Sequence, residues 1–370
     1  MTVRVSPFLA TLDAVPIYRS TWLDPVGRQV KLNHNESAQD APARLKSIAL
    51  ERLAAAPWHR YPDPHASALR SALARALGVT IESIVLGNGG NELIGRLFQS
   101  LRRDATILIC TPGYYIYGRA AATQGLATIE IPLQPSSDGA TPFDIDADAV
   151  LERARTCACP VLCLAQPNNP TAALLSEESI SRILKGFIGL SGLVVIDEAY
   201  VDYSGVSHLE TIAERRDVVI MRTLSKAFGL AGVRLGALLA HPETAATIEK
   251  LALPYALGLP AQIIGEAALA CAEEVRTLAQ DTVRERDRLA AALGAVLGAI
   301  PEAKVHPSAT NFLLVDFGPA AAQVRTSLQA DAITVRDLAT VPRLESCLRI
   351  SVGRRDENDR LVAAVRAALR

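Results

Sequence analysis

A single lysine, Lys226, stands among small and hydroxylated residues directly after the apolar run 218–220, which is typical of a short buried strand. A lysine in this setting is poorly solvated, and poor solvation favours its neutral amine. A neutral amine can attack an aldehyde and form a Schiff base. Thr223, Ser225 and Arg234 flank the lysine in the sequence and have side chains that can hold a phosphate. Taken alone, an ordinary loop lysine is an equally good interpretation.

A second pair of candidates, Asp197 and Tyr200, follows the apolar run 193–196. A carboxylate at this place can pair with a pyridinium nitrogen, and the tyrosine can reach the oxygen beside it. Pyridoxal phosphate (PLP) needs a Schiff-base lysine, an acid at its ring nitrogen and donors for its phosphate. The two stretches together therefore predict a PLP site.

A glycine-rich turn, Gly89, Gly90 and Asn91, lies between the predicted strand 84–86 and a predicted helix. Glycines let the backbone approach a ligand closely, and the free N–H groups of a helix N-terminus favour a phosphate. The turn is weak evidence by itself. Beside the lysine stretch it predicts a phosphate cup.

Short apolar strands alternate with helices from about residue 80 to 240, which predicts a mainly parallel sheet with helices on both faces. Ligands of such sheets bind at the carboxyl ends of the strands. Five candidates fall just after predicted strands: Gly89, Tyr114, Asn169, Asp197 and Lys226. We therefore expect these five residues to meet at one edge of the sheet.

The rest of the chain is organised differently. Residues 242–298 are almost all helical by pattern, and three predicted strands and two helices follow, which suggests a smaller α+β domain. We expect an N-terminal arm over 1–40 associated with the small domain and with an active-site lid, a large cofactor-binding domain over 41–265, and a small domain over 266–370.

Composition excludes several classes of protein. The 370 residues have a formal net charge of −1, which gives no reason to expect nucleic acid or an acidic membrane as a partner. No apolar run approaches the roughly 20 residues of a membrane span, and the start lacks a signal peptide, so we expect a cytoplasmic protein. Cys157, Cys159 and Cys163 do not have zinc spacing, and no metal is predicted.

Four motifs in the order of one family complete the pattern: Asn-Pro-Thr at 169–171, Asp-x-x-Tyr at 197–200, the lysine stretch at 221–234, and Leu-Arg-Ile-x-Val-Gly at 348–353. The chain thus resembles the fold-type I PLP enzymes, and most closely the histidinol-phosphate aminotransferases. The resemblance implies an α/β fold in which a large domain holds a mainly parallel seven-stranded sheet between helices, beside a smaller α+β domain.

The resemblance also implies roles for individual residues. Asn169 and Tyr200 would tune the cofactor's ring oxygen, and the ring of Tyr114 would stack on the pyridine. Tyr61 would reach the phosphate bound by a second subunit, which implies a homodimer. Four further residues would serve the substrate: Tyr18 in a lid, Asn35 in an L-N-x-N-E motif, and Arg336 and Arg349 at its phosphate and anionic end.

The activity implied is transfer of the amino group of L-histidinol phosphate to 2-oxoglutarate, giving imidazole-acetol phosphate and L-glutamate in histidine biosynthesis. Lys226 would act as general base. The chain departs from the family pattern at Ser37, Asn91, Gly113 and Ala172, and residues 117–120 also resemble threonine-phosphate decarboxylases. An aromatic or other amino-acid aminotransferase and a decarboxylase of a phosphorylated amino acid therefore remain alternatives. A PLP-binding regulator is disfavoured because there is no basic patch.

Overall fold

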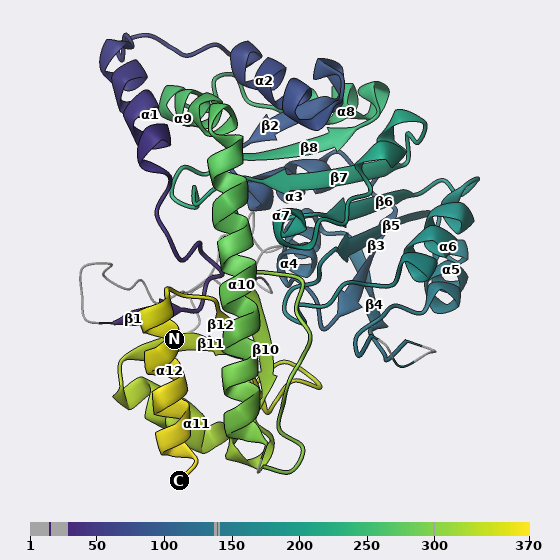
Figure 1. Cartoon of the computed structure of the whole chain (residues 1–370). Coiled ribbons are helices and arrows are strands. Elements are labelled where there is room, and N and C mark those ends of the chain that lie inside the picture. Colours follow the sequence, from purple (N-terminus) through teal and green to yellow (C-terminus); the bar gives the residue numbers. More distant parts are fainter. Residues whose placement is uncertain (1–14, 16–28, 137–138, 140, 299) are drawn as a thin grey trace, which may run out of the picture.

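The computed structural model describes residues 15, 29–136, 139, 141–298 and 300–370, which build two sheets (Figure 1). The larger sheet has seven strands. In order across the sheet they are β2 (Ile84–Gly87), β8 (Gly236–Ala240), β7 (Val218–Thr223), β6 (Leu193–Asp197), β5 (Cys159–Ala165), β3 (Ala105–Thr111) and β4 (Ala127–Pro132).

Strand directions confirm the predicted, mainly parallel sheet, with one reversal. Strands β3 to β7 pair in parallel, whereas β8 is antiparallel to both of its neighbours. The register pairs Thr223 with Gly236, so the lysine stretch is the connection between two antiparallel neighbours. Such a connection begins and ends at the same edge of the sheet. Lys226 and Arg234 are thereby kept at the carboxyl ends of the parallel strands.

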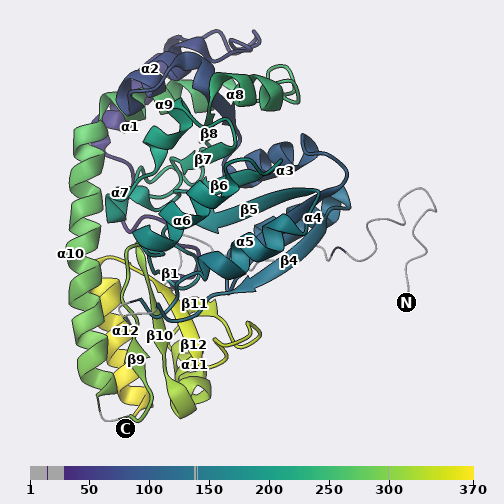
Figure 2. The same cartoon turned by 90° about the vertical axis from the view of Figure 1, so that its right-hand side faces the viewer.

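Helices cover both faces of this sheet, and side chains alternate between the two cores as strand geometry requires (Figure 2). In β7, Val219 and Met221 face one core, while Val218 and Ile220 face the other. The first core is closed by α3 (Gly90–Gln99), α4 (Ile116–Gln124) and α8 (Pro242–Glu249). The second is closed by α1 (Ala43–Ala55), α2 (Ser67–Leu77), α5 (Ala147–Arg155), α6 (Glu177–Phe187) and α9 (Leu259–Ala270).

The smaller sheet has five strands, in the order β1 (Val30–Leu32), β11 (Ile333–Asp337), β12 (Cys347–Ser351), β10 (Phe312–Asp316) and β9 (Lys304–Val305). One apolar core joins this sheet to α10 (Ala272–Leu297), α11 (Ala321–Ala330) and α12 (Arg355–Ala368). Strand β1 comes from the start of the chain and pairs in parallel with β11. The segment that follows β1 is therefore attached to the small sheet where it enters the cleft between the sheets.

The long helix α10 runs beside both sheets, as Figures 1 and 2 show. Its 26 residues span about 39 Å at the α-helical rise. It packs against α9 and the short helix α7 (Val201–Ser204) at the large domain and against α12 in the small domain. Helix α10 therefore connects the part of the chain that contains the large sheet with the part that contains the small sheet.

Sequence periodicity predicted one helical region over 242–298, with breaks near Gly258 and Pro260, and the structure has three helices there. Helix α8 ends at Glu249, α9 begins at Leu259, and Cys271 separates α9 from α10. The backbone of Cys271 is not helical, with φ −111° and ψ 24°. The sequence has no glycine or proline at this second break, so nothing in it predicts the break. Within the described residues there are also three short 3₁₀ helices: η2 (Ile81–Ser83), η3 (Leu209–Ala213) and η4 (Gly318–Ala320). No helix within the described ranges is long and apolar enough to cross a membrane.

Candidate functional site

A cleft of about 880 Å³ lies between the carboxyl ends of the large sheet and the edge of the small sheet. The large domain lines it with residues from five of its strand ends, and the small domain contributes two arginines. Thirteen residues singled out from the sequence line it: Asn35, Gly90, Asn91, Tyr114, Asn169, Asp197, Tyr200, Thr223, Ser225, Lys226, Arg234, Arg336 and Arg349.

Lys226 projects its amine into this cleft from the connection after β7. Burial, together with the nearby guanidiniums of Arg349 and Arg234, lowers the pKa of the amine from 10.5 to about 8, and the charges of Glu36 and Asp197 oppose this shift. The amine Nζ donates to the backbone oxygen of His34 at 3.2 Å. A sizeable neutral fraction near pH 7 makes this lysine a competent nucleophile and base.

Asp197, the last residue of β6, offers a buried and oriented carboxylate. Its Oδ1 accepts from the backbone N–H of Ala199 at 3.1 Å, and its Oδ2 accepts from the hydroxyl of Tyr117 at 2.9 Å. Burial raises the pKa of this carboxyl to about 6, while the two hydrogen bonds oppose the rise. Asp197 is thus mostly ionised at pH 7 and can pair with a cationic ring nitrogen.

Tyr200 lies at the centre of a polar network that joins both domains. Asn35 donates from Nδ2 to the Tyr200 hydroxyl at 2.9 Å, and Nδ2 of Asn169 lies 3.5 Å from the same oxygen. Arg349 donates from Nη1 to Oδ1 of Asn169 at 2.6 Å and from Nη2 to the backbone oxygen of Asn33 at 2.8 Å. The Nε of Arg349 is buried and has no hydrogen-bond partner among the described residues.

The turn before α3 and Arg234 form a cradle of the kind that holds a phosphate. Gly89 has φ 83° and ψ 171°, a conformation that is essentially restricted to glycine, and Nη2 of Arg234 lies 2.3 Å from where a Cβ would be. Arg234 also donates to Oγ of Ser225 at 3.3 Å, and the Ser225 N–H donates to Oγ1 of Thr223 at 3.1 Å. A guanidinium, hydroxyls and a helix N-terminus thus converge beside Gly90.

The ring of Tyr114 is fixed at its hydroxyl and at its edge. The hydroxyl donates to Oδ1 of Asn91 at 2.8 Å. The ring meets that of Tyr117 edge to face, with centroids 5.6 Å apart and planes at 86°. The side chain of Asn91 is therefore engaged with Tyr114, and this neutral amide adds no negative charge beside the phosphate cradle.

Tyr61 lies away from the cleft of its own chain. Tyr61 has 81% of its surface exposed and stacks on Tyr255, with ring centroids 4.5 Å apart. Tyr18 lies outside the described residues. Gly89 backs the cradle without lining the cleft, and Arg336 faces the cleft from β11, opposite Arg349 on β12.

Sequence reasoning missed two contacts. These are the bond from the Tyr117 hydroxyl to Asp197 and the bond from Lys226 to the backbone oxygen of His34. The spacing of three between Tyr114 and Tyr117 is a signal that both lie on the same side of a helix start. No signal in the sequence brings the backbone of His34 to Lys226, because that contact depends on the pairing of β1 with β11.

The donor set of the cleft fits PLP. The amine of Lys226, whose pKa is lowered, lies in the same cleft as the buried carboxylate of Asp197. The amide of Asn169 and the phenol of Tyr200 lie together and could both donate to a ring oxygen. The cradle at Arg234 would hold the phosphate. The Nε of Arg349 has no hydrogen-bond partner among the described residues, which suits a site for an anion. These are the partners that a pyridine ring with an aldehyde and a phosphate requires.

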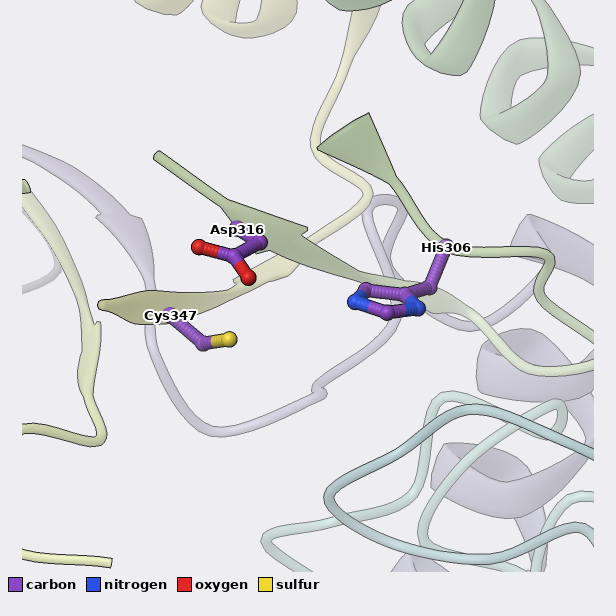
Figure 3. Close-up of side chains that lie close together, drawn as sticks. All are labelled: His306, Asp316 and Cys347. Carbon is purple, nitrogen blue, oxygen red and sulfur yellow. The ribbon is translucent and has the colours of Figure 1, made fainter. Parts of the chain in front are cut away.

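A group of possible metal ligands lies away from this cleft, on the small sheet: His306, Asp316 and Cys347 (Figure 3). Their ligand atoms all lie within 4.8 Å of one another. Burial raises the pKa of the Cys347 thiol to about 12, and the register places Lys304 opposite Asp316. A protonated thiol and a neighbouring ammonium oppose a cation, so we assign no metal to this group; the prediction that no metal takes part stays a prediction.

Comparison with known proteins agrees with this geometry. The family model for aminotransferase class I and II matches residues 27–365. A histidinol-phosphate aminotransferase of Stenotrophomonas maltophilia is 37% identical over 96% of this chain and 94% of its own, and that of Deinococcus radiodurans is 35% identical over 95% and 94%. The crystal structure of histidinol-phosphate aminotransferase from Sinorhizobium meliloti in complex with pyridoxal-5'-phosphate is 25% identical and superposes with a TM-score of 0.85, covering 99% of this chain and 98% of that one.

Proposed function

The chain belongs to the class I and II aminotransferase family, and from this premise we propose that it is a PLP-dependent aminotransferase acting in histidine biosynthesis. It transfers the amino group of L-histidinol phosphate to 2-oxoglutarate, and the products are imidazole-acetol phosphate and L-glutamate. Relatives of that name, more than a third identical over nearly the whole chain, support the substrate. The observation that carries the proposal is the lowered pKa of Lys226 in a cleft that also holds Asp197 and the Arg234 cradle.

Each side chain has a defined task in this reaction. When bound, PLP supplies a ring that accepts electrons from the substrate carbon. The amine of Lys226 would take the proton from the substrate carbon that carries the nitrogen and pass it to the carbon that was the cofactor's aldehyde, and it would run this transfer in the opposite direction with the 2-oxo acid. The carboxylate of Asp197 would keep the ring nitrogen protonated. The amide of Asn169 and the hydroxyl of Tyr200 would donate to the ring oxygen, and Tyr114 would cover the ring face.

Arg336 and Arg349 select an anionic substrate. Both guanidiniums face the cleft from adjacent small-domain strands, in register with each other. Arginine grips phosphate and carboxylate with paired N–H donors. L-Histidinol phosphate carries a phosphate and 2-oxoglutarate carries two carboxylates, so the same pair of arginines serves both halves of the reaction. Asn35, held by Tyr200 and Ser351, is proposed to complete this side of the substrate site.

The proposal includes a homodimer in the cytoplasm. The exposed face around Tyr61 also presents Trp58, Leu253 and Tyr255, and apolar surface of this kind is covered when two subunits meet. Tyr61 would then reach the phosphate in the second subunit. The six cysteines are unpaired, as in compartments that keep thiols reduced.

Mixed dimers test the role of Tyr61. We expect a dimer with one Lys226→Ala subunit and one Tyr61→Ala subunit to regain about half of the wild-type activity, because one of its sites then has an intact lysine and an intact tyrosine from opposite chains. Each homodimer of a variant is the control. A mixed dimer no more active than the Tyr61→Ala homodimer would show that Tyr61 does not act across the interface.

The substrate is tested by a half-reaction on PLP-loaded protein. L-Histidinol phosphate alone should bleach the absorbance of the bound cofactor, and 2-oxoglutarate should restore it. L-Histidinol, which lacks the phosphate, should need a concentration about 100-fold higher, because it leaves charged donors unpaired. If another amine bleaches the cofactor and L-histidinol phosphate does not, the substrate assignment is wrong. Release of carbon dioxide from a phosphorylated amino acid would instead establish the decarboxylase.

A further inference from the structure

The buried hydroxyl of Tyr117 is a polar group near the cofactor site that the mechanism above does not use. Tyr117 lies in the first turn of α4 and has 3% of its surface exposed. Its hydroxyl donates to Oδ2 of Asp197 at 2.9 Å, across 80 residues of sequence. Its ring meets Tyr114 edge to face. One side chain therefore contacts both the acid for the ring nitrogen and the aromatic cover of the ring.

We propose that Tyr117 is a positioning residue that orients the carboxylate of Asp197 and favours its ionised form. This inference rests on the proposed function, because it concerns the partner of the cofactor's ring nitrogen. With the N–H of Ala199 on Oδ1 and the hydroxyl of Tyr117 on Oδ2, both carboxylate oxygens are fixed from opposite elements. The carboxylate cannot rotate without breaking one of these bonds, so its remaining lone pairs keep one direction.

The hydrogen bond also acts on charge. A hydroxyl that donates to a carboxylate favours the charged form of the carboxylate. Burial and the neighbouring Asp197 raise the pKa of Tyr117 well above its ordinary range, so this hydroxyl remains a donor at every pH at which the protein works. The burial that raises the pKa of Asp197 is thus opposed first by Tyr117.

Other groups around Asp197 must be weighed in any effect of pH. Lys226 opposes the rise in the pKa of Asp197 and Glu198 adds to it. Asp197 in turn raises the pKa of groups on the strands and helices packed around it: Tyr114, Cys163 and Tyr200. Among the described partners of the carboxylate oxygens, Tyr117 is the side chain that donates a hydrogen bond to it.

Tyr117→Phe keeps the ring and removes the donor, and pyridoxamine phosphate is the probe. Equilibrium dialysis with cofactor-free protein gives its dissociation constant from pH 5 to 9. In the wild type, affinity should fall as pH drops through about 6, where Asp197 takes up a proton. In Tyr117→Phe this midpoint should move upward by about one to two pH units, and affinity at pH 7 should fall about two- to tenfold. The phosphate of the probe ionises in the same way with every variant. A difference in midpoint between two variants therefore reports on the protein and not on the probe.

Matched variants separate positioning from a merely structural role. Tyr203→Phe removes the hydroxyl of another buried tyrosine, on α7, and should leave the midpoint unchanged. In an Asp197→Asn background, Tyr117→Phe should have no further effect on affinity. Should the phenylalanine variant fail to fold, 3,5-difluorotyrosine at 117 keeps ring and donor, and its stronger donation should move the midpoint downward.

The outcomes are distinguishable. A wild-type protein that does not bind pyridoxamine phosphate would overturn the proposed function itself. A wild type that binds, together with an unmoved midpoint in Tyr117→Phe or an equal shift in Tyr203→Phe, would overturn the role of Tyr117 alone. A difluorotyrosine protein with the wild-type midpoint would do the same.

Discussion

Replacing Lys226 by alanine is expected to lower the rate of the half-reaction by about 10⁴-fold or more, because one side chain both attaches the cofactor and moves the proton. Its amine is suited to both tasks, since burial and two guanidiniums lower its pKa to about 8. Stopped-flow measurement of the cofactor absorbance with L-histidinol phosphate gives the rate. Borohydride reduction followed by intact mass spectrometry should find the cofactor fixed to the wild type and absent from the variant.

The control for this variant is Lys185→Ala, which removes an exposed lysine from the last turn of α6. It should leave both the rate and the attached cofactor unchanged. Added methylamine should restore part of the proton transfer in Lys226→Ala, because a small amine can enter the space that the side chain leaves. Normal turnover with a covalently retained cofactor would show that another residue is the anchor.

The central part of this site could be predicted because it follows from local sequence. Asp197 is the last residue of one short buried strand and Lys226 follows the end of another by three residues, and strands of one direction place their ends at one edge. The direction of β8 could not be predicted from its apolar pattern, which is the same for parallel and antiparallel neighbours. Because β8 runs antiparallel to β7, the lysine stretch that connects them begins and ends at the same edge of the sheet.

Contacts between distant segments were not predictable from periodicity. The bond from Tyr117 to Asp197 joins residues from two different strand–helix units, and the bond from Arg349 to Asn169 spans the two domains. The amide of Asn35 is bonded to Tyr200 and to Ser351, and its predicted contact with the substrate stays a prediction. Contacts between the domains depend on the relative position of the two sheets. A short sequence motif carries no information about that position.

Two departures from the family pattern have a structural explanation. Ala172 stands where the family has glycine and adopts φ 63°, a left-handed conformation that an alanine reaches only with strain. It is fully buried in the turn after Asn169, which holds it there. At position 113 this chain has glycine where the family has threonine, and only glycine fits, because a Cβ would lie 2.1 Å from the backbone oxygen of Cys110. The backbone before Tyr114 therefore runs closer to β3 than a threonine would permit.

Asp197→Asn is expected to remove most of the activity and to make the cofactor-free protein more stable. The amide keeps the shape of the carboxylate but cannot hold a proton on the ring nitrogen, and losing one partner of a buried charge pair costs about 3–5 kcal/mol. We expect a rate about 10²–10⁴-fold lower. Affinity for pyridoxamine phosphate should also lose its dependence on Asp197, so that the fall near pH 6 disappears.

The stability gain follows from linkage between protonation and folding. Burial raises the pKa of Asp197 from 3.8 to about 6, so between these values the folded protein holds a proton that the unfolded chain has released. The free energy of unfolding therefore falls as pH rises through this window, by about 3 kcal/mol in total. Asparagine removes that penalty. Scanning calorimetry of the cofactor-free protein should show Tm raised by a few degrees at pH 8 and hardly changed at pH 4.

The two effects have opposite signs, and this makes the prediction sharp. A variant that lost activity through misfolding would also lose stability, whereas a carboxylate kept ionised for the cofactor destabilises the empty protein. The exposed Asp148→Asn, which breaks a surface pair with Arg182, should change neither activity nor Tm appreciably. An Asp197→Asn protein that is less stable than the wild type at pH 8 would mean that the acid is held by interactions stronger than those of Tyr117 and Ala199, and that its burial is no longer the dominant influence on its pKa.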